Sequence, residues 1–523
     1  MCISPRNTCA VNSSARLPSP RLHQALVNFS PRLPTAQYAK LTWFTPIYRM
    51  RVVVIGGGCV GLATALRLAQ RRVGQVVLVE RHAAGVGLEC SLANASLLCA
   101  AHSYPMQMRA SSIVKWSLFA DQNVRLEWRH LFADHMFWAF AASALRHWPR
   151  SHEQRLDSSQ KLSAMAQYGI SELKKTVAEI FPEYKIAKRG LLSLHDDSSA
   201  LQEEARTMRE FVPLYPCRVL NVEEACNLEP NLSRLVEKGL KGAVLLEDES
   251  TAEPYPVSRR VYEECCRLGV EFATGSQCNR LQVEDGHVQA VQLANGDNIE
   301  GDVFVICAGA YSPFLLDLDV RLGLKGGPMP IYPLRGHSLT LDVPDNARGT
   351  IFTRPVSWRS RRVYITPLPH TGQIRVAGFG DFGGYQRGPS GARHDRIAEL
   401  LNGARTLLPG LVPDSCDDFR KRDQVAGFAA DDCIRAWSGL RPQSADNVPI
   451  VGRYGASSSN LYINSGSGTY CEHPLALYDY CFISGHGVMG WTSSHGSATL
   501  VADLITGCRP ALDDTHYSPN RFL

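Results

Sequence analysis

The 523-residue sequence lacks several patterns that would assign it to a special class of proteins. None of its 16 cysteines forms a C-x-x-C pair, so neither a zinc site nor a disulfide framework is predicted, and we expect reduced, unreactive thiols. No run of about 18 apolar residues occurs, so no membrane-spanning helix is predicted. Basic residues exceed acidic ones by only 55 to 50 and do not cluster, so we expect no nucleic-acid partner.

Acidic residues are absent from the start of the chain, where the first one is Glu80. Residues 1–49 instead carry several Arg, Ser and Pro. An acid-poor, arginine- and serine-rich N-terminus resembles an organelle transit peptide, so we expect mitochondrial import, with a cytoplasmic protein as the alternative. The other interpretation is that Met50 is the true start and that residues 1–49 are a non-native extension.

The remaining composition is that of a folded globular protein, and its length exceeds what a single core usually serves. Alternating strand-like and helix-like runs predict an α/β protein. We expect a discontinuous Rossmann-like nucleotide domain formed by residues 50–100, 255–320 and 432–523. A mixed β-sheet substrate domain, formed by residues 101–254 and 321–431, would be inserted into it. The apolar stretch Met136–Leu145 is predicted to be a buried helix, with shallow membrane contact as the alternative.

A βαβ unit with a glycine-rich turn follows Met50. The apolar run Val52–Ile55 leads into Gly56–Gly61, which matches G-x-G-x-x-G, and a helix-like segment follows. The glycines permit a tight turn, close approach of a pyrophosphate and close packing of the helix on the strand. Glu80 ends the next apolar run, where a carboxylate binds the ribose hydroxyls of a dinucleotide. The turn therefore predicts a dinucleotide site without a 2′-phosphate.

Four further segments resemble one family. They are Leu88–Ala95 (LECSLANA), Val303–Ser312 (VFVICAGAYS), Tyr332–Ser338 (YPLRGHS) and Trp437–Gly452 (WSGLRPQSADNVPIVG). Together with the glycine-rich turn, and in this order from Met50 to about Arg509, they resemble the D-amino-acid oxidase superfamily of FAD-dependent oxidoreductases, and most closely its bacterial D-amino-acid dehydrogenases.

The resemblance implies FAD as cofactor and assigns residues to it. Gly56, Gly58 and Gly61 would bind the pyrophosphate and Glu80 the ribose, while helix capping is the alternative role for Ser91 and Asn94. The full set of implied cofactor-binding residues is Val54, Ile55, Gly56, Gly57, Gly58, Cys59, Val60, Gly61, Glu80, Arg81, Ser91, Asn94, Ala95, Cys278, Ala308, Gly309, Gly485, His486, Gly487, Val488, Gly490 and Thr492. No metal is expected.

The resemblance also implies oxidation of the Cα–N bond of a small amino acid, giving an imino acid and then a 2-oxo acid and ammonia. Arg441 would grip the substrate carboxylate, because a guanidinium matches a carboxylate with two parallel hydrogen bonds. A structural pairing of Arg441 with Asp446 is the alternative. His337, where the family has Tyr, would either bind substrate or pack. The electron acceptor would be a quinone, a carrier or oxygen.

Two other functions fit the same motifs. One is glycine or sarcosine oxidase-like amine oxidation. The other is a mitochondrial assembly factor that binds FAD without turnover, which an amine-reduction assay would separate from an enzyme.

Residues 467–485 interrupt a motif that relatives carry without a break. Asn464-Ser465-Gly466 and His486–Thr492 read in register with the family only when the segment between them is removed. It is expected to be either a lid over the active site or a retained intron translated in frame, and to alter the flavin site in either case.

Overall fold

The computed structural model describes residues 50–101, 103, 124–149, 151–213, 215–316, 329–385, 393–412, 434–467, 471–472, 483–484 and 489–523. The chain divides into a unit Met1–Pro46 and a unit Ile47–Leu523. The expectation for residues 1–49 lies outside the described residues, and all that follows concerns the second unit. Within the described ranges, no helix is long and apolar enough to cross a membrane.

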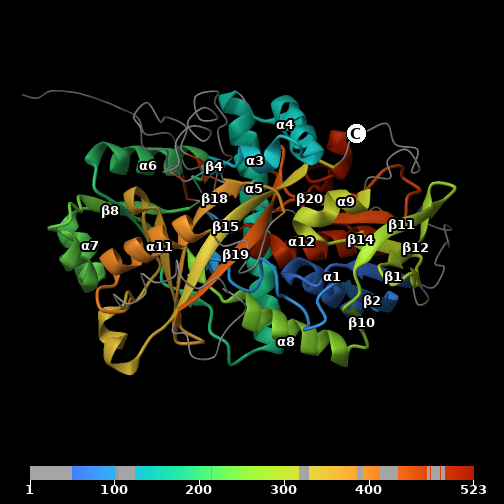
Figure 1. Cartoon of the computed structure of the whole chain (residues 1–523), viewed down its shortest axis with the longest axis horizontal. Helices are drawn as coiled ribbons and strands as arrows, with labels where there is room; N and C mark the ends of the chain where they lie inside the picture. Colours follow the sequence, from blue (N-terminus) through green and yellow to red (C-terminus); the bar gives the residue numbers. More distant parts are fainter. Residues whose placement is uncertain are drawn as a thin grey trace, which may run out of the picture. The chain divides into compact units, whose positions relative to one another are not determined.

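A six-stranded sheet in the described part of the chain contains the expected βαβ unit (Figure 1). Its order is β10 (Glu271–Thr274), β2 (Gly74–Glu80), β1 (Met50–Ile55), β14 (Val303–Ile306), β21 (Leu461–Ser465) and β20 (Ile450–Arg453). All neighbouring strands pair in parallel except β20. Val52, Val53 and Val54 are fully buried, as expected of a parallel sheet covered on both faces.

Four helices pack on or beside this sheet: α1 (Cys59–Gln70), α5 (His152–Ile180), α8 (Pro254–Arg267) and α12 (Met489–Thr506). Helices α5 and α12 cross with their backbones in contact. A Cβ built on Gly169 would lie 2.2 Å from the Thr492 carbonyl oxygen, and one on Gly496 would lie 2.7 Å from the Gly169 nitrogen. Only glycine permits this approach, which fixes the first turn of α12.

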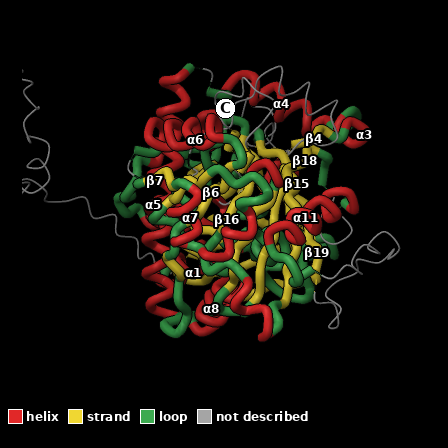
Figure 2. The backbone as a smooth tube through the Cα atoms, turned by 90° about the vertical axis from the view of Figure 1, so that its left-hand side faces the viewer, coloured by secondary structure: helices red, strands yellow, loops and turns green. Residues whose placement is uncertain are grey.

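The second sheet has nine strands and is mixed. Its order is β19 (Ile434–Ser444), β15 (Ile331–Asp342), β18 (Gln373–Phe382), β17 (Val363–Leu368), β16 (Val356–Trp358), β6 (Leu191–His195), β8 (Gly242–Leu246) and β7 (Cys217–Leu220), with β4 (Val124–Leu126) paired to β18. Pairs β16–β6 and β18–β4 are parallel, whereas the long pairs β15–β18 and β15–β19 are antiparallel. Figure 2 shows the strands inside the molecule and the helices around them. The predicted α/β class with a second, mixed sheet is confirmed.

The pairing of β19 bears on the expected domain boundary. Residues 434–444 were expected in the nucleotide domain with the rest of 432–523, but β19 pairs with β15 along its whole length. We therefore propose that the third segment of the nucleotide domain begins after Ser444. The sequence of β19 does not indicate which of the two sheets the strand joins, because its apolar side chains would be buried in either sheet.

The remaining elements connect the two sheets or cover them. The helices are α3 (Trp128–Leu131), α4 (His135–His147), α6 (Ser198–Phe211), α7 (Val222–Leu228), α9 (Ser312–Leu316), α11 (His394–Leu407), η2 (Pro230–Leu235), η3 (Gly309–Tyr311), η4 (Asp345–Thr350), η5 (Arg359–Arg361), η7 (Asp514–His516) and η8 (Pro519–Phe522). The remaining described strands form three small sheets: β11 (Cys278–Glu284), β12 (His287–Leu293) and β13 (Asn298–Glu300); β3 (Leu97–Leu98), β9 (Ser250–Thr251) and β5 (Ala187–Lys188); and β22 (Cys471–Glu472) with β23 (Ile483–Ser484).

Helix α4 corrects one expectation from the sequence. Met136, Phe137 and Phe140 are buried as predicted, but Trp138 is 47% and Leu145 is 59% exposed. Positions 138 and 145 are two turns apart and lie on the same face. The stretch Met136–Leu145 is therefore a half-buried helix rather than a fully buried one.

Candidate active site

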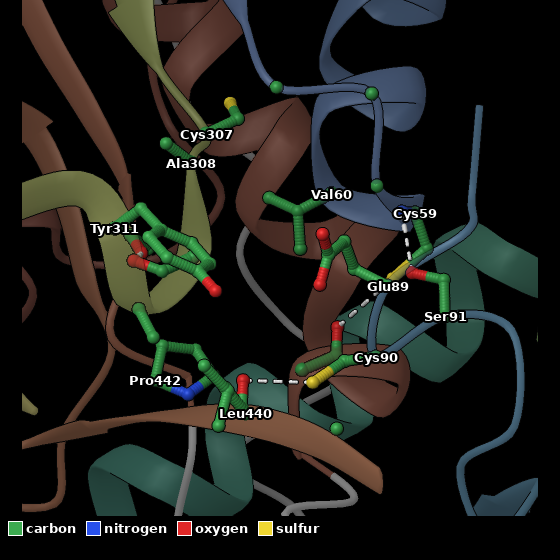
Figure 3. Close-up of a pocket in the computed structure, with 18 of the residues that line it drawn as sticks. Cys59, Val60, Glu89, Cys90, Ser91, Cys307, Ala308, Tyr311, Leu440 and Pro442 are labelled. Atoms are coloured by element: carbon green, nitrogen blue, oxygen red, sulfur yellow. Dashed lines mark hydrogen bonds between the residues drawn. The ribbon is translucent and has the colours of Figure 1, made fainter. Parts of the chain in front are cut away.

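A cavity of about 590 Å³ lies at the carboxyl ends of β1, β2 and β14 and extends to β15 and β19 of the second sheet. In open α/β sheets ligands bind at this edge, where the ends of parallel strands meet. In Figure 3, Cys59, Glu89, Cys90 and Ser91 stand on one side of the cavity, and Tyr311 and Pro442 stand on the other. The cavity therefore lies between the two sheets.

The three motif glycines have different roles. Gly56 has φ +111°, and a Cβ there would lie 2.5 Å from the Cys307 carbonyl oxygen. A Cβ on Gly61 would lie 1.8 Å from the Gly56 carbonyl oxygen. Gly58 has an ordinary extended backbone, and the nearest atom to its Cβ would be the Ser91 hydroxyl oxygen at 3.6 Å. The fold thus requires glycine at 56 and 61, whereas at 58 only a ligand in the cavity would require it.

Glu80 is held by backbone amides at the rim of this turn. Its Oε2 accepts a hydrogen bond of 2.7 Å from the Gly57 amide, and its Oε1 accepts one of 2.8 Å from the His82 amide. The side chain is buried and borders the cavity. Each carboxylate oxygen has further lone pairs, so Glu80 can still accept from ribose hydroxyls.

The next two expected residues, Ser91 and Asn94, both border the cavity and both stabilise local structure. The Ser91 hydroxyl accepts a hydrogen bond of 3.0 Å from the Cys59 amide in the first turn of α1 (Figure 3). Asn94 Oδ1 accepts one of 2.8 Å from the Ser96 amide. The Ser91 contact is a cap on helix α1, whereas the Asn94 contact closes a turn and caps no helix. Both side chains also border the cavity.

The cavity gathers most of the other expected cofactor residues. It is bordered by Ile55, Gly56, Gly57, Gly58, Cys59, Val60, Glu80, Arg81, Ala95, Cys278, Ala308, Gly309 and Gly490. Val54, Gly61 and Thr492 do not border it, as far as the described residues define it. The Thr492 hydroxyl oxygen accepts a hydrogen bond of 3.3 Å from the Cys99 amide instead. Gly485, His486, Gly487 and Val488 lie outside the described residues.

Four polar atoms in the cavity wall are buried without a hydrogen-bond partner among the described residues. They are His337 Nδ1, Trp437 Nε1, Asn464 Oδ1 and Ser467 Oγ. Buried polar atoms are nearly always satisfied in folded proteins, so unsatisfied ones at a cavity point to a ligand. With the open space above Gly58, they fit a long polar cofactor such as a dinucleotide.

Arg441 projects from β19 into the cavity wall and is 9% exposed. Its Nη1 donates a hydrogen bond of 2.9 Å to the Phe379 carbonyl oxygen. Asp446, the alternative partner, instead binds Arg521, with Nε–Oδ2 at 2.7 Å and Nη2–Oδ1 at 3.1 Å. The geometry therefore favours the interpretation in which Arg441 serves the cavity.

His337 borders the cavity, but its imidazole belongs to a buried ion-pair cluster. Its Nε2 lies 3.0 Å from Asp381 Oδ2, and Arg396 of α11 donates to Asp381 Oδ1 at 2.7 Å. Burial lowers the pKa of His337, which the hydrogen bond to Asp381 only partly opposes. Burial alone would raise the pKa of Asp381, but His337 and the Arg396 charge outweigh it and hold that pKa well below its ordinary value. These contacts hold His337 through Nε2, whereas its Nδ1 is buried at the cavity without a hydrogen-bond partner among the described residues.

An aromatic and ionic bridge at the cavity rim was not predicted from the sequence. The Arg81 guanidinium carbon lies 4.0 Å from the centre of the Tyr311 ring, and Arg81 pairs with Glu89. The side chains of Arg81 and Glu89 are 23% and 26% exposed although both border the cavity, so they lie at its mouth. Tyr311 stands inside the Val303–Ser312 motif, but no local pattern shows that it meets Arg81.

The start of the segment 467–485 lies at the cavity. Ser467 borders it, and a Cβ built on Gly490, five residues past the segment, would lie 3.9 Å from the Ser467 Cβ. Ser467 and Gly490 are therefore neighbours. Apart from Ser467 and the short pair β22–β23, the segment lies outside the described residues.

Comparison with known proteins agrees with this arrangement. The family model described as "FAD dependent oxidoreductase" matches residues 51–504. The chain is 30% identical to a D-amino acid dehydrogenase of Methylobacterium nodulans over 91% of its own length and 99% of the relative's. It is 28% identical to a D-amino acid dehydrogenase of Chromohalobacter salexigens, over 90% of this chain and 100% of the other.

Solved structures share the fold. Glycine oxidase from Geobacillus kaustophilus superposes with a TM-score of 0.58 at 20% identity, over 91% of this chain and all of that one. L-proline dehydrogenase from P. horikoshii gives a TM-score of 0.57 at 17% identity, over 91% and 98%. The family match covers most of the chain and the cavity suits a dinucleotide, so this chain belongs to the family of FAD-dependent oxidoreductases and has FAD as its cofactor.

Proposed function

We propose that the protein oxidises the Cα–N bond of D-amino acids to imino acids, which water converts to 2-oxo acids and ammonia. The observation that carries the proposal is the position of the Arg441 guanidinium in the wall of the cavity. The names of the relatives support the D configuration. Electrons would leave to a quinone, a carrier or oxygen.

The residues around the cavity would hold FAD along its length. The amides at the start of α1 would face the pyrophosphate, where the helix N-terminus favours negative charge, and Glu80 would accept from the ribose hydroxyls. Once bound, FAD supplies the two-electron acceptor for amine oxidation.

Arg441 would bind the substrate carboxylate and so fix the position of the Cα–H bond. Arg441 Nη1 donates to the Phe379 carbonyl oxygen, and a guanidinium presents its N–H donors in a planar fork that matches a carboxylate. A charge-assisted hydrogen bond is worth about 1.5–3 kcal/mol. The carboxylate is bonded to the reacting Cα, so holding it restricts the orientation of the Cα–H bond, and such orientation lowers the barrier of a reaction.

The remaining chemistry asks little of the side chains. A substrate amine that arrives neutral has a lone pair that assists loss of the α-hydrogen, so no protein base is required. His337 is held by Asp381 through Nε2, so only the Nδ1 side of its imidazole can face the cavity. Mitochondrial import of the protein stays a prediction from residues 1–49.

The test is anaerobic reduction of the bound flavin by D- and L-amino acids, glycine and sarcosine, in wild type and in Arg441→Ala. D-amino acids should bleach the flavin most efficiently, and Arg441→Ala should raise their KM roughly ten- to hundred-fold with unchanged flavin content. Preferential reduction by glycine or sarcosine would replace the substrate assignment. A flavin that no amine reduces would favour the non-catalytic assembly factor, and lost folding with an unchanged KM would return Arg441 to a structural role.

A further inference from the structure

The carbonyl that holds Arg441 comes from a residue with an unusual backbone. Phe379 in β18 has φ +62°, in the left-handed region that favours glycine. For a bulky aromatic residue this conformation is a true outlier, which persists only where the surroundings enforce it. Such outliers gather at functional sites, so the contacts of Phe379 give a reason to look for a role.

The surroundings of Phe379 enforce the conformation from two sides. In the pairing of β15 with β18, Arg335 lies opposite Asp381 and His337 lies opposite Gly378, which leaves one extra residue in β18. The Phe379 ring is 2% exposed, and the Arg396 guanidinium carbon lies 4.4 Å from its centre. Arg396 is itself bound to Asp381. The strand irregularity and the anchored ring together hold the residue in place.

The result of this conformation is the direction of one carbonyl group. The Phe379 oxygen accepts the hydrogen bond of 2.9 Å from Arg441 Nη1. On the other side the guanidinium lies directly against Gly336. A Cβ at Gly336 would come within 2.2 Å of Arg441 Nη2 and 2.4 Å of its Cζ. Any side chain at 336 would therefore displace the guanidinium.

We propose that Gly336 and Phe379 are positioning residues that together aim Arg441 at the substrate carboxylate. Gly336 provides the space for the guanidinium, and the left-handed Phe379 provides the acceptor that fixes its rotation. This inference rests on the proposed function, in which Arg441 binds that carboxylate. It adds that the strength of the grip is set by backbone geometry in β15 and β18, outside the Arg441 motif.

The first test is Gly336→Ala in the full-length holoprotein. Only the mobile end of Arg441 has to move, so the variant should fold and retain FAD. We expect its KM for D-alanine to rise roughly tenfold or more, towards the value of Arg441→Ala, with a smaller change in kcat. The dissociation constant of propanoate, measured by the change that propanoate causes in flavin absorbance, should rise by a similar factor. Gly349→Ala is the matched control, because a Cβ there meets nothing within 4 Å.

The second test separates the backbone of Phe379 from its ring. Phe379→Val and Phe379→Asn both remove the ring, but asparagine tolerates the left-handed region and valine does not. Propanoate should bind the valine variant more weakly than the asparagine variant. Phe352→Val is the control for loss of a buried ring, since Phe352 is 1% exposed and lies 5.1 Å below the Arg234 guanidinium carbon in the same core.

The outcomes distinguish the two proposals. If Arg441→Ala leaves propanoate affinity unchanged, the proposed carboxylate grip is wrong. If Arg441→Ala loses propanoate but Gly336→Ala binds it like wild type, the positioning role is overturned while the grip stands. Equal affinity in the valine and asparagine variants would remove Phe379 from the inference, and if the valine variant does not fold, Gly336→Ala decides alone.

Discussion

Glu249 gives the sharpest prediction about stability. This side chain is 2% exposed between β8 and β9, where its Oε1 accepts a hydrogen bond of 2.8 Å from the Ala101 amide. Its Oε2 is buried without a partner among the described residues. Burial raises the pKa of Glu249 from 4.5 to about 7, which the hydrogen bonds from Ala101 and Cys99 only partly oppose.

The sign of the pH dependence follows from this shift. The unfolded chain loses the Glu249 proton from about pH 4.5, whereas the folded protein keeps it until about pH 7. The stabilisation is therefore full below pH 4.5 and is lost as the pH rises to 7. The difference of 7 − 4.5, at about 1.36 kcal/mol per pKa unit, gives an upper limit of about 3 kcal/mol.

Glu249→Gln removes this titration while keeping a neutral side chain of the same shape. The free energy of unfolding of the variant, relative to wild type, should rise by up to about 3 kcal/mol between pH 5 and pH 8. Denaturant titrations of the FAD-saturated proteins at both pH values measure it. Glu253→Gln is the control, since both oxygens of that buried carboxylate accept hydrogen bonds, and it should destabilise the protein. A relative stability of Glu249→Gln that does not change with pH would refute the reasoning.

Three other changes test the cavity. Gly58→Val should fold, with an unchanged melting temperature of the apoprotein, but bind no flavin, whereas Gly61→Ala should fail to fold. Full flavin occupancy in Gly58→Val would contradict the assignment of the cofactor site. Arg81→Gln and Tyr311→Leu should each release FAD roughly two- to thirtyfold faster in a dilution assay, because a cation–π contact is worth about 0.5–2 kcal/mol. An unchanged rate of FAD release would show that the contact between Arg81 and Tyr311 does not retain the cofactor. Removal of residues 467–485 should leave a flavin-binding protein with equal or higher turnover, since Ser467 and Gly490 are adjacent; higher activity in the longer form, or a transcript that always retains the segment, would favour the lid.

The sequence alone determined the nucleotide half of the fold and its cofactor class. The apolar runs of β1 and β2, the glycine-rich turn between them and Glu80 at the end of β2 are local patterns, and each follows from backbone geometry over a few residues. The family motifs are also local patterns, so they could be recognised in the sequence in their order along the chain. The positions of most implied cofactor residues around one cavity follow from these local elements.

The tertiary structure alone decided which residues meet across long separations. Arg521 binds Asp446, which lies 75 positions away in the sequence, and Arg396 of α11 joins Asp381 and His337 in a buried cluster. The requirement for glycine at 56 likewise depends on Cys307, which directly follows β14. Such pairings carry no local signature, because the partners are neighbours only once both sheets have formed.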